Sequence, residues 1–76
     1  MGAYEFVMLC YSIVRDYANR VIKQPFDECN YKLVRLDWYR NGNAQIDYYP
    51  YIFIITEDEH GAFVRVYSDK ESYQVT

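Results

Sequence analysis

The residues that most resemble a chemical site are clustered in one polar segment. His60, the only histidine, follows three consecutive acids, Glu57, Asp58 and Glu59. A histidine beside carboxylates can act as a general base, but that chemistry also needs a nucleophile and a pocket, and the sequence indicates neither. A calcium loop spaces its ligands at alternate positions, with a glycine turn and a closing glutamate, whereas these acids are consecutive. We therefore expect a solvated hairpin turn, with no catalytic residue and no metal site.

The other reactive residue types lack the spacing that chemistry requires. Cys10 and Cys29 are too few for a disulfide framework and do not form a metal-binding motif. The chain contains no P-loop, dinucleotide-binding fingerprint, zinc motif or Cys–His nucleophile arrangement. The sequence therefore predicts a protein that is not an enzyme and holds no cofactor.

A second set of carboxylates is expected on a sheet. Residues 31–40 alternate between apolar and polar types, and a three-residue turn at 41–43 would place Asp37 directly opposite Asp47 on the outer face. Like charges in that arrangement are destabilising. Either Arg35 compensates the two negative charges in an ordinary surface cluster, or the two aspartates bind an arginine or lysine of a partner. A paired-carboxylate hydrolase would need a cleft, which an open sheet of this size does not offer.

Aromatic residues and arginines are expected on the same outer face. They are Tyr39, Tyr49, Phe63 and Tyr67, with Tyr51 as a further candidate, together with Arg35 and Arg65. RNA-recognition modules stack bases on such rings but surround them with basic residues. Here the face would carry two aspartates and the chain has a formal charge of −3. We therefore expect no direct nucleic-acid binding. The rings fit a protein interface, or they stabilise a thin sheet through cross-strand pairs.

Residues 3–23 are predicted to form one amphipathic helix. Its apolar stripe is Val7, Cys10, Tyr11, Val14, Tyr17, Ala18 and Val21. Pro25 disfavours helical backbone at the residue before it and so ends the helix. Phe6, Leu9 and Ile13 widen the apolar arc beyond what one sheet contact needs. Either the sheet curls around the helix or these three residues contact another chain, and we favour the second interpretation.

Three extended segments follow the helix, at residues 31–40, 44–56 and 62–68, and residues 73–76 are a candidate short fourth strand. Pro50 makes the second segment an edge strand, a bulged strand or two separate strands. A bulge would turn Tyr51, Phe53 and Ile55 toward the helix. The short turns predict an α+β fold, with the N-terminal helix packed on one face of a three- to four-stranded antiparallel β-meander.

Composition agrees with one domain spanning residues 1–76. A chain this short needs a dense core, and 51% of its residues are hydrophobic and 20% aromatic. No segment is long and apolar enough to span a bilayer, and the first residues do not resemble a signal peptide. We expect a cytoplasmic protein that binds no membrane, because membrane surfaces are anionic like the chain itself.

These features together favour binding over catalysis. We expect a small acidic protein-binding module, an inhibitor that occupies a partner's surface in the manner of immunity proteins, antitoxins or phage antagonists of host defence. The partner would be another protein, and one version of the hypothesis has the carboxylates mask a basic, nucleic-acid-binding site. The predicted partner-binding residues are Asp37, Asp47, Tyr39, Tyr49, Tyr67, Glu57, Asp58 and Glu59. The alternative is a structural or homo-oligomerisation domain, in its simplest form a homodimer through Phe6, Leu9 and Ile13.

Overall fold

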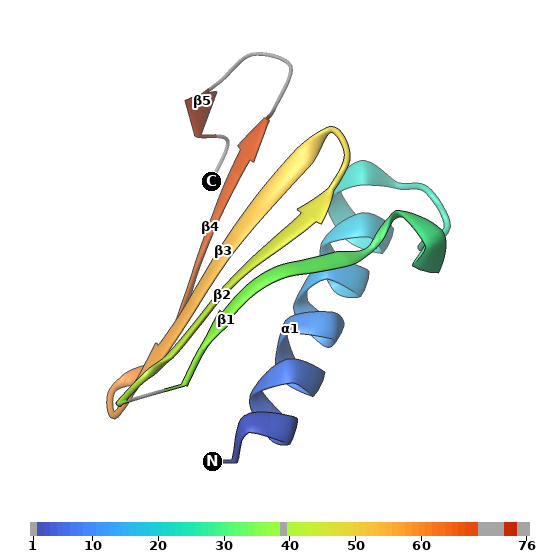
Figure 1. Cartoon of the computed structure of the whole chain (residues 1–76). Helices are drawn as coiled ribbons and strands as arrows, with labels where there is room; N and C mark the ends of the chain where they lie inside the picture. Colours follow the sequence, from blue (N-terminus) through green and yellow to red (C-terminus); the bar gives the residue numbers. More distant parts are fainter. Residues whose placement is uncertain (1, 39, 69–72, 75–76) are drawn as a thin grey trace.

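A long N-terminal helix lies across one face of an antiparallel sheet (Figure 1). The computed structural model describes residues 2–38, 40–68 and 73–74. Helix α1, Ala3–Tyr17, continues directly into a π-helical turn, η1, Ala18–Ile22. Lys23 then adopts the left-handed conformation with φ 60° and ends the helical segment. The predicted helix over residues 3–23 is therefore confirmed in its extent.

The buried side of the helical segment differs in part from the predicted stripe. Phe6, Cys10, Val14 and Ala18 are fully buried, at a spacing of four residues. Val21, which was predicted to face the core, is 58% exposed. The prediction is wrong at this position because the wider π turn rotates the residues beyond Tyr17, so that Ile22 packs against the core instead.

Aromatic contacts hold the connection between the helix and the sheet. The single-turn 3₁₀ helix η2, Glu28–Asn30, is capped by the Asp27 side chain, which accepts a hydrogen bond from the Cys29 N–H at 3.0 Å. The Asp27 N–H donates to the Tyr48 hydroxyl at 2.8 Å, and the Phe26 ring stacks on the Tyr48 ring at 5.5 Å. Tyr48 therefore helps to hold this connection against the sheet.

The strands follow one another in sequence order across the sheet, as an antiparallel meander does. They are β1 Lys32–Asp37, β2 Gly42–Tyr48, β3 Tyr51–Asp58, β4 Gly61–Ser68 and the two-residue β5 Tyr73–Gln74. The predicted α+β architecture is confirmed. The segment 44–56 breaks into two strands at the turn Tyr49–Pro50, whose peptide bond is cis, so the third alternative for Pro50 is the correct one.

The predicted register between the first two strands is wrong. Asp37 pairs with Asn43, whereas Asp47 pairs with Lys32, and a bulge interrupts the ladder between Leu33 and Arg35. The two aspartates therefore do not lie opposite each other. The physical reason is that β2 begins earlier than expected, at Gly42, so that residues 42 and 43 belong to the strand instead of the turn.

Gly42 is the first residue of β2, and two aromatic rings occupy the space that a side chain at this position would fill. The rings of Phe6 and Trp38 are 5.0 Å apart. A Cβ at Gly42 would lie 2.5 Å from Trp38 Cζ3 and 2.8 Å from the Phe6 ring. The start of α1, the end of β1 and the start of β2 therefore meet at this glycine.

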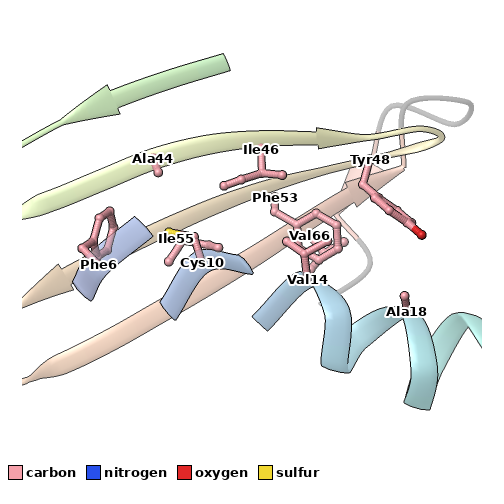
Figure 2. Close-up of a cluster of buried hydrophobic side chains, with 10 residues drawn as sticks. All are labelled: Phe6, Cys10, Val14, Ala18, Ala44, Ile46, Tyr48, Phe53, Ile55 and Val66. Atoms are coloured by element: carbon pink, nitrogen blue, oxygen red, sulfur yellow. The ribbon is translucent and has the colours of Figure 1, made fainter. Parts of the chain in front are cut away.

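The core lies between the helix and β2–β4 (Figure 2). The helix contributes Phe6, Cys10, Val14 and Ala18, and the sheet contributes Ala44, Ile46, Tyr48, Phe53, Ile55 and Val66. Phe6 is fully buried within the chain, so the prediction that it contacts another chain is wrong. Leu9 and Ile13 are half-buried and pack against the same core. Among the described residues, no helix is both long and apolar enough to cross a membrane.

Candidate protein-binding surface

The side of the sheet opposite α1, here called the outer face, is not covered by any described segment (Figure 1). Alternation along the strands and their register assign its residues. They are Lys32, Arg35 and Asp37 in β1, Asn43, Gln45 and Asp47 in β2, Ile52, Ile54 and Thr56 in β3, and Phe63, Arg65 and Tyr67 in β4. All of these residues are exposed or half-buried. The outer face is therefore the side of the sheet that α1 leaves open.

An apolar strip crosses the outer face along β3 and β4. Ile52 is paired with Tyr67, and Ile54 is paired with Arg65. Phe63 lies at the end of the strip and is 59% exposed. Ile52, Ile54 and Tyr67 are half-buried. Apolar groups that gather on an open surface in this way are typical of sites that bind another molecule. We call Ile52, Ile54, Phe63 and Tyr67 the apolar strip.

The charges on the outer face are mixed in sign. Lys32 is paired across the ladder with Asp47, and Gln45 Nε2 donates a hydrogen bond to Asp47 Oδ1 at 3.2 Å. Asp37 is far from Asp47 on this face. Asp37 is paired with Asn43, and Asn43 is four residues from Asp47 along β2, a distance of about 14 Å at the usual rise per residue. The described outer face therefore carries three basic side chains and two separated carboxylates, and it is not an acidic surface.

The remaining predicted carboxylates gather at one end of the sheet. A shallow hollow of about 330 Å³ is lined by Trp38, Arg40, Asn41, Gly42, Glu57, Asp58 and Glu59. A neighbouring hollow shares Arg40 and also contains Asp37. We call Asp37, Glu57, Asp58 and Glu59 the acidic end. It lies where the β1–β2 and β3–β4 connections meet.

His60 lies in the exposed turn beside the acidic end. The backbone N–H of His60 donates a hydrogen bond to Asp58 Oδ1 at 2.8 Å, and the imidazole Nε2 is 3.4 Å from Glu59 Oε1. Both side chains are largely exposed. In the described part of the chain, no three His, Cys, Asp or Glu side chains are grouped in a way that could hold a metal ion.

The groups with shifted pKa values lie away from the outer face. Burial raises the pKa of Cys10 to about 11 and that of Tyr31 to about 12. The Tyr11 hydroxyl donates to Glu28 Oε1 at 2.7 Å, and this hydrogen bond raises the pKa of Tyr11. Cys10 and Tyr31 therefore remain protonated at neutral pH, which is the opposite of what an activated nucleophile needs.

The structure divides the predicted partner-binding residues into two groups. Asp37, Glu57, Asp58 and Glu59 form the acidic end, whereas Asp47, Tyr49 and Tyr67 lie toward the opposite end of the sheet. Tyr39 lies outside the described residues. Tyr51 faces the helix, where its ring is 5.9 Å from that of Tyr17.

The sequence leaves open whether Ile52 and Ile54 are surface residues, and the structure agrees with the alternative in which Phe53 and Ile55 face the helix. The run from Tyr51 to Ile55 is apolar throughout, so its alternation does not reveal which side chains face outward. The turn at Pro50 sets the phase, because it pairs Tyr48 with Tyr51 and thereby directs Ile52 and Ile54 to the outer face.

No protein-family model, curated protein or solved structure matches this chain. The function is therefore inferred from the chemistry of the surface.

Proposed function

We propose that this protein is a small protein-binding module that presents its outer face to another protein and acts by covering part of that protein's surface. The observation that supports this proposal is the apolar strip on an open sheet face. A 76-residue domain gains stability from each large apolar side chain that it buries, yet Ile52, Ile54, Phe63 and Tyr67 are left on the side without a helix.

The surroundings of the strip resemble the anatomy of a protein interface. Such interfaces have an apolar centre, in which aromatic residues and arginine are enriched, and a polar rim. Here Arg65 lies next to Phe63 in the hollow that both line, and Gln45 and Asp47 border the strip on β2. Arginine is among the residue types that most often supply the strongest contacts of an interface, and phenylalanine is enriched at interfaces.

The acidic end indicates the chemistry of the partner. Asp37 lies on the outer face at the Phe63 end of the apolar strip, and Asp58 and Glu59 lie beside it at the β3–β4 turn. Glu57 is paired with Gly42 and lies at the same end of the sheet on the helix side. A partner that contacts the strip would therefore meet negative charge at one end of the contact, and lysines or arginines there would pair with it. An inhibitor that covers the basic, phosphate-binding groups of a nucleic-acid-binding protein fits this arrangement.

A binding comparison between matched variants tests the proposal. The wild-type protein, Phe63→Ser and Arg65→Glu would be immobilised and exposed to extract of the cells that encode the chain. Tyr4→Ser is the control, because Tyr4 is an exposed aromatic residue on the helix. We expect a protein that the wild type and Tyr4→Ser retain and that both outer-face variants lose.

Two results would contradict the proposal. One is that no protein is retained by the wild type at any salt concentration. The other is that a retained protein binds Phe63→Ser and Arg65→Glu as well as it binds the wild type. The role of the acidic end is tested separately with Glu57→Gln, Asp58→Asn and Glu59→Gln combined, which should weaken binding at low salt and reduce its salt dependence.

A further inference from the structure

Strand β1 is an edge strand with a largely exposed surface. It is the first strand of the sheet and is paired on one side only, with β2, in the described part of the chain. All six of its residues are exposed, and they include Leu33 at 39%, Val34 at 54% and Leu36 at 40%. An edge of this kind presents backbone N–H and C=O groups to any strand that can align with them.

The bulge in β1 gives its side chains an unusual symmetry. Leu33 pairs with Ile46 and Leu36 pairs with Ala44, so both leucines lie on the helix side of the sheet. In a regular strand, residues three apart would lie on opposite faces. Here Val34 is the extra residue of the bulge, and it brings the two leucines to the same face. Lys32 and Asp37, the two ends of the strand, both lie on the outer face.

We propose that β1 pairs with β1 of a second copy of this chain in an antiparallel dimer. The first two and last two residues of the strand, Lys-Leu-Val-Arg-Leu-Asp, are complementary when the strand is aligned with its own reverse, and Val34 then lies opposite Arg35 at the centre. Antiparallel alignment about its centre places Lys32 opposite Asp37 of the second copy, and Leu33 opposite Leu36 of the second copy. Each of these pairs joins residues of the same face, as sheet geometry requires.

Charge complementarity is what indicates a second copy as the occupant of this edge. The two-fold symmetry forms two lysine–aspartate pairs, one at each end of the joined strands. Lys32 would then lie between Asp47 of its own chain and Asp37 of the second copy. A carboxylate has room for several hydrogen bonds, so Asp37 can accept this pair alongside the interactions it makes within its own chain.

The two α1 helices leave space for this pairing. The axis of the dimer would be perpendicular to the sheet, so both α1 helices would lie on the same side. The helix packs over β2 and β3, and with strands about 4.8 Å apart the two helices would be roughly 20 Å or more from each other, about twice a helix diameter. The four leucines would lie between them. The two outer faces would join into one continuous surface.

The dimer does not rest on the proposed binding function, and the two are tested by different measurements. The first measurement is sedimentation equilibrium from low micromolar to millimolar concentration. We expect wild-type dimers, and dissociation constants raised at least tenfold in Lys32→Asp and in Asp37→Lys, because each change puts like charges opposite each other at both ends. Arg65→Asp, a charge reversal on β4, is the control and should dimerise like the wild type.

Mixing the two single variants provides the decisive test. Alone, each has like charges opposed, but one copy of Lys32→Asp aligned with one copy of Asp37→Lys restores both pairs. We expect the mixture to form a 1:1 heterodimer, which also shows that both variants are folded, and the double variant to dimerise with itself. A bulge can also serve to prevent edge pairing. A wild-type protein that stays monomeric throughout, or a dimer that both single reversals leave intact, would overturn the proposal.

Discussion

At the scale of single residues, Gly42 is a point where the helix and the sheet meet. Its position under the rings of Phe6 and Trp38 joins the first turn of α1 to the first β-hairpin. A glycine next to two asparagines is a strong turn signal, and the sequence therefore predicts a turn at residues 41–43. The structure uses the same glycine for close packing of two rings, a role that the local sequence pattern does not distinguish from a turn.

We predict that Gly42→Ala destabilises the protein by about 1–3 kcal/mol, since the new methyl group would overlap both rings and force them to move. The control is Asn43→Ala, at the next position of the same strand but on the outer face, and it should change the free energy of unfolding by less than about 0.5 kcal/mol. Urea denaturation of both variants measures the difference. Equal stability of Gly42→Ala and the wild type would show that the two rings do not pack over residue 42.

At the scale of elements, the sequence predicts the helix and the strands well and their mutual register poorly. Helix periodicity and Pro25 locate the helical segment, because both act within a few residues of the chain. The β1–β2 register depends instead on contacts between residues 6, 38 and 42 and on a bulge at Val34. Neither is visible in local alternation, so the predicted pair of Asp37 with Asp47 was wrong.

The π turn at the end of the helix gives an element-scale prediction. Val14 is fully buried, whereas Val21 lies in η1 and is exposed. We expect Val14→Ala to lower the free energy of unfolding by about 2 kcal/mol, through lost burial and a residual cavity. Val21→Ala should change it by less than about 0.5 kcal/mol. Thermal or urea denaturation of the pair measures this, and similar losses in both variants would mean that the helix continues with α-helical spacing to its end.

At the scale of the whole molecule, the structure separates carboxylates that the sequence predicts to lie together. The acids predicted for partner binding were expected together, yet the structure places Asp47 among basic and amide groups and the others at the acidic end. Sequence reasoning identified the residue types of the candidate surface, including Tyr67 and Asp37. It left the phase of Ile52 and Ile54 open, because an all-apolar run does not reveal which side chains face outward.

Stability of the whole molecule should fall in alkaline solution. The pKa of Cys10 rises from 9.0 to about 11 on folding and that of Tyr31 from 10.0 to about 12, in both cases mainly through burial. Below pH 9 both groups are protonated in the folded and unfolded chains, and the stabilisation is complete. As the pH rises from about 9 to 12, the unfolded chain loses protons that the folded chain retains, so the free energy of unfolding decreases.

Tyr31→Phe is the matched variant for this pH series. The Tyr31 hydroxyl is buried and has no hydrogen-bond partner among the described residues. Removing it should raise the free energy of unfolding by about 1 kcal/mol at pH 7. The decrease with pH should also be shallower in Tyr31→Phe than in the wild type. Denaturation curves that shift in parallel for the two proteins would contradict the assignment of Tyr31 to the buried side.

The contact between Trp38 and Phe6 has one more consequence. Trp38 is the single tryptophan of the chain, and its half-buried indole lies 5.0 Å from a ring on the first turns of α1. Indole emission moves to longer wavelength when water reaches the ring, so intrinsic fluorescence will report when the helix leaves the sheet. Because the indole packs over Gly42 on the helix side, ligands confined to the apolar strip should leave that signal unchanged, whereas a partner that also enters the hollow at the acidic end would meet Trp38 there. The protein thus contains its own optical probe of unfolding, with no need for a label.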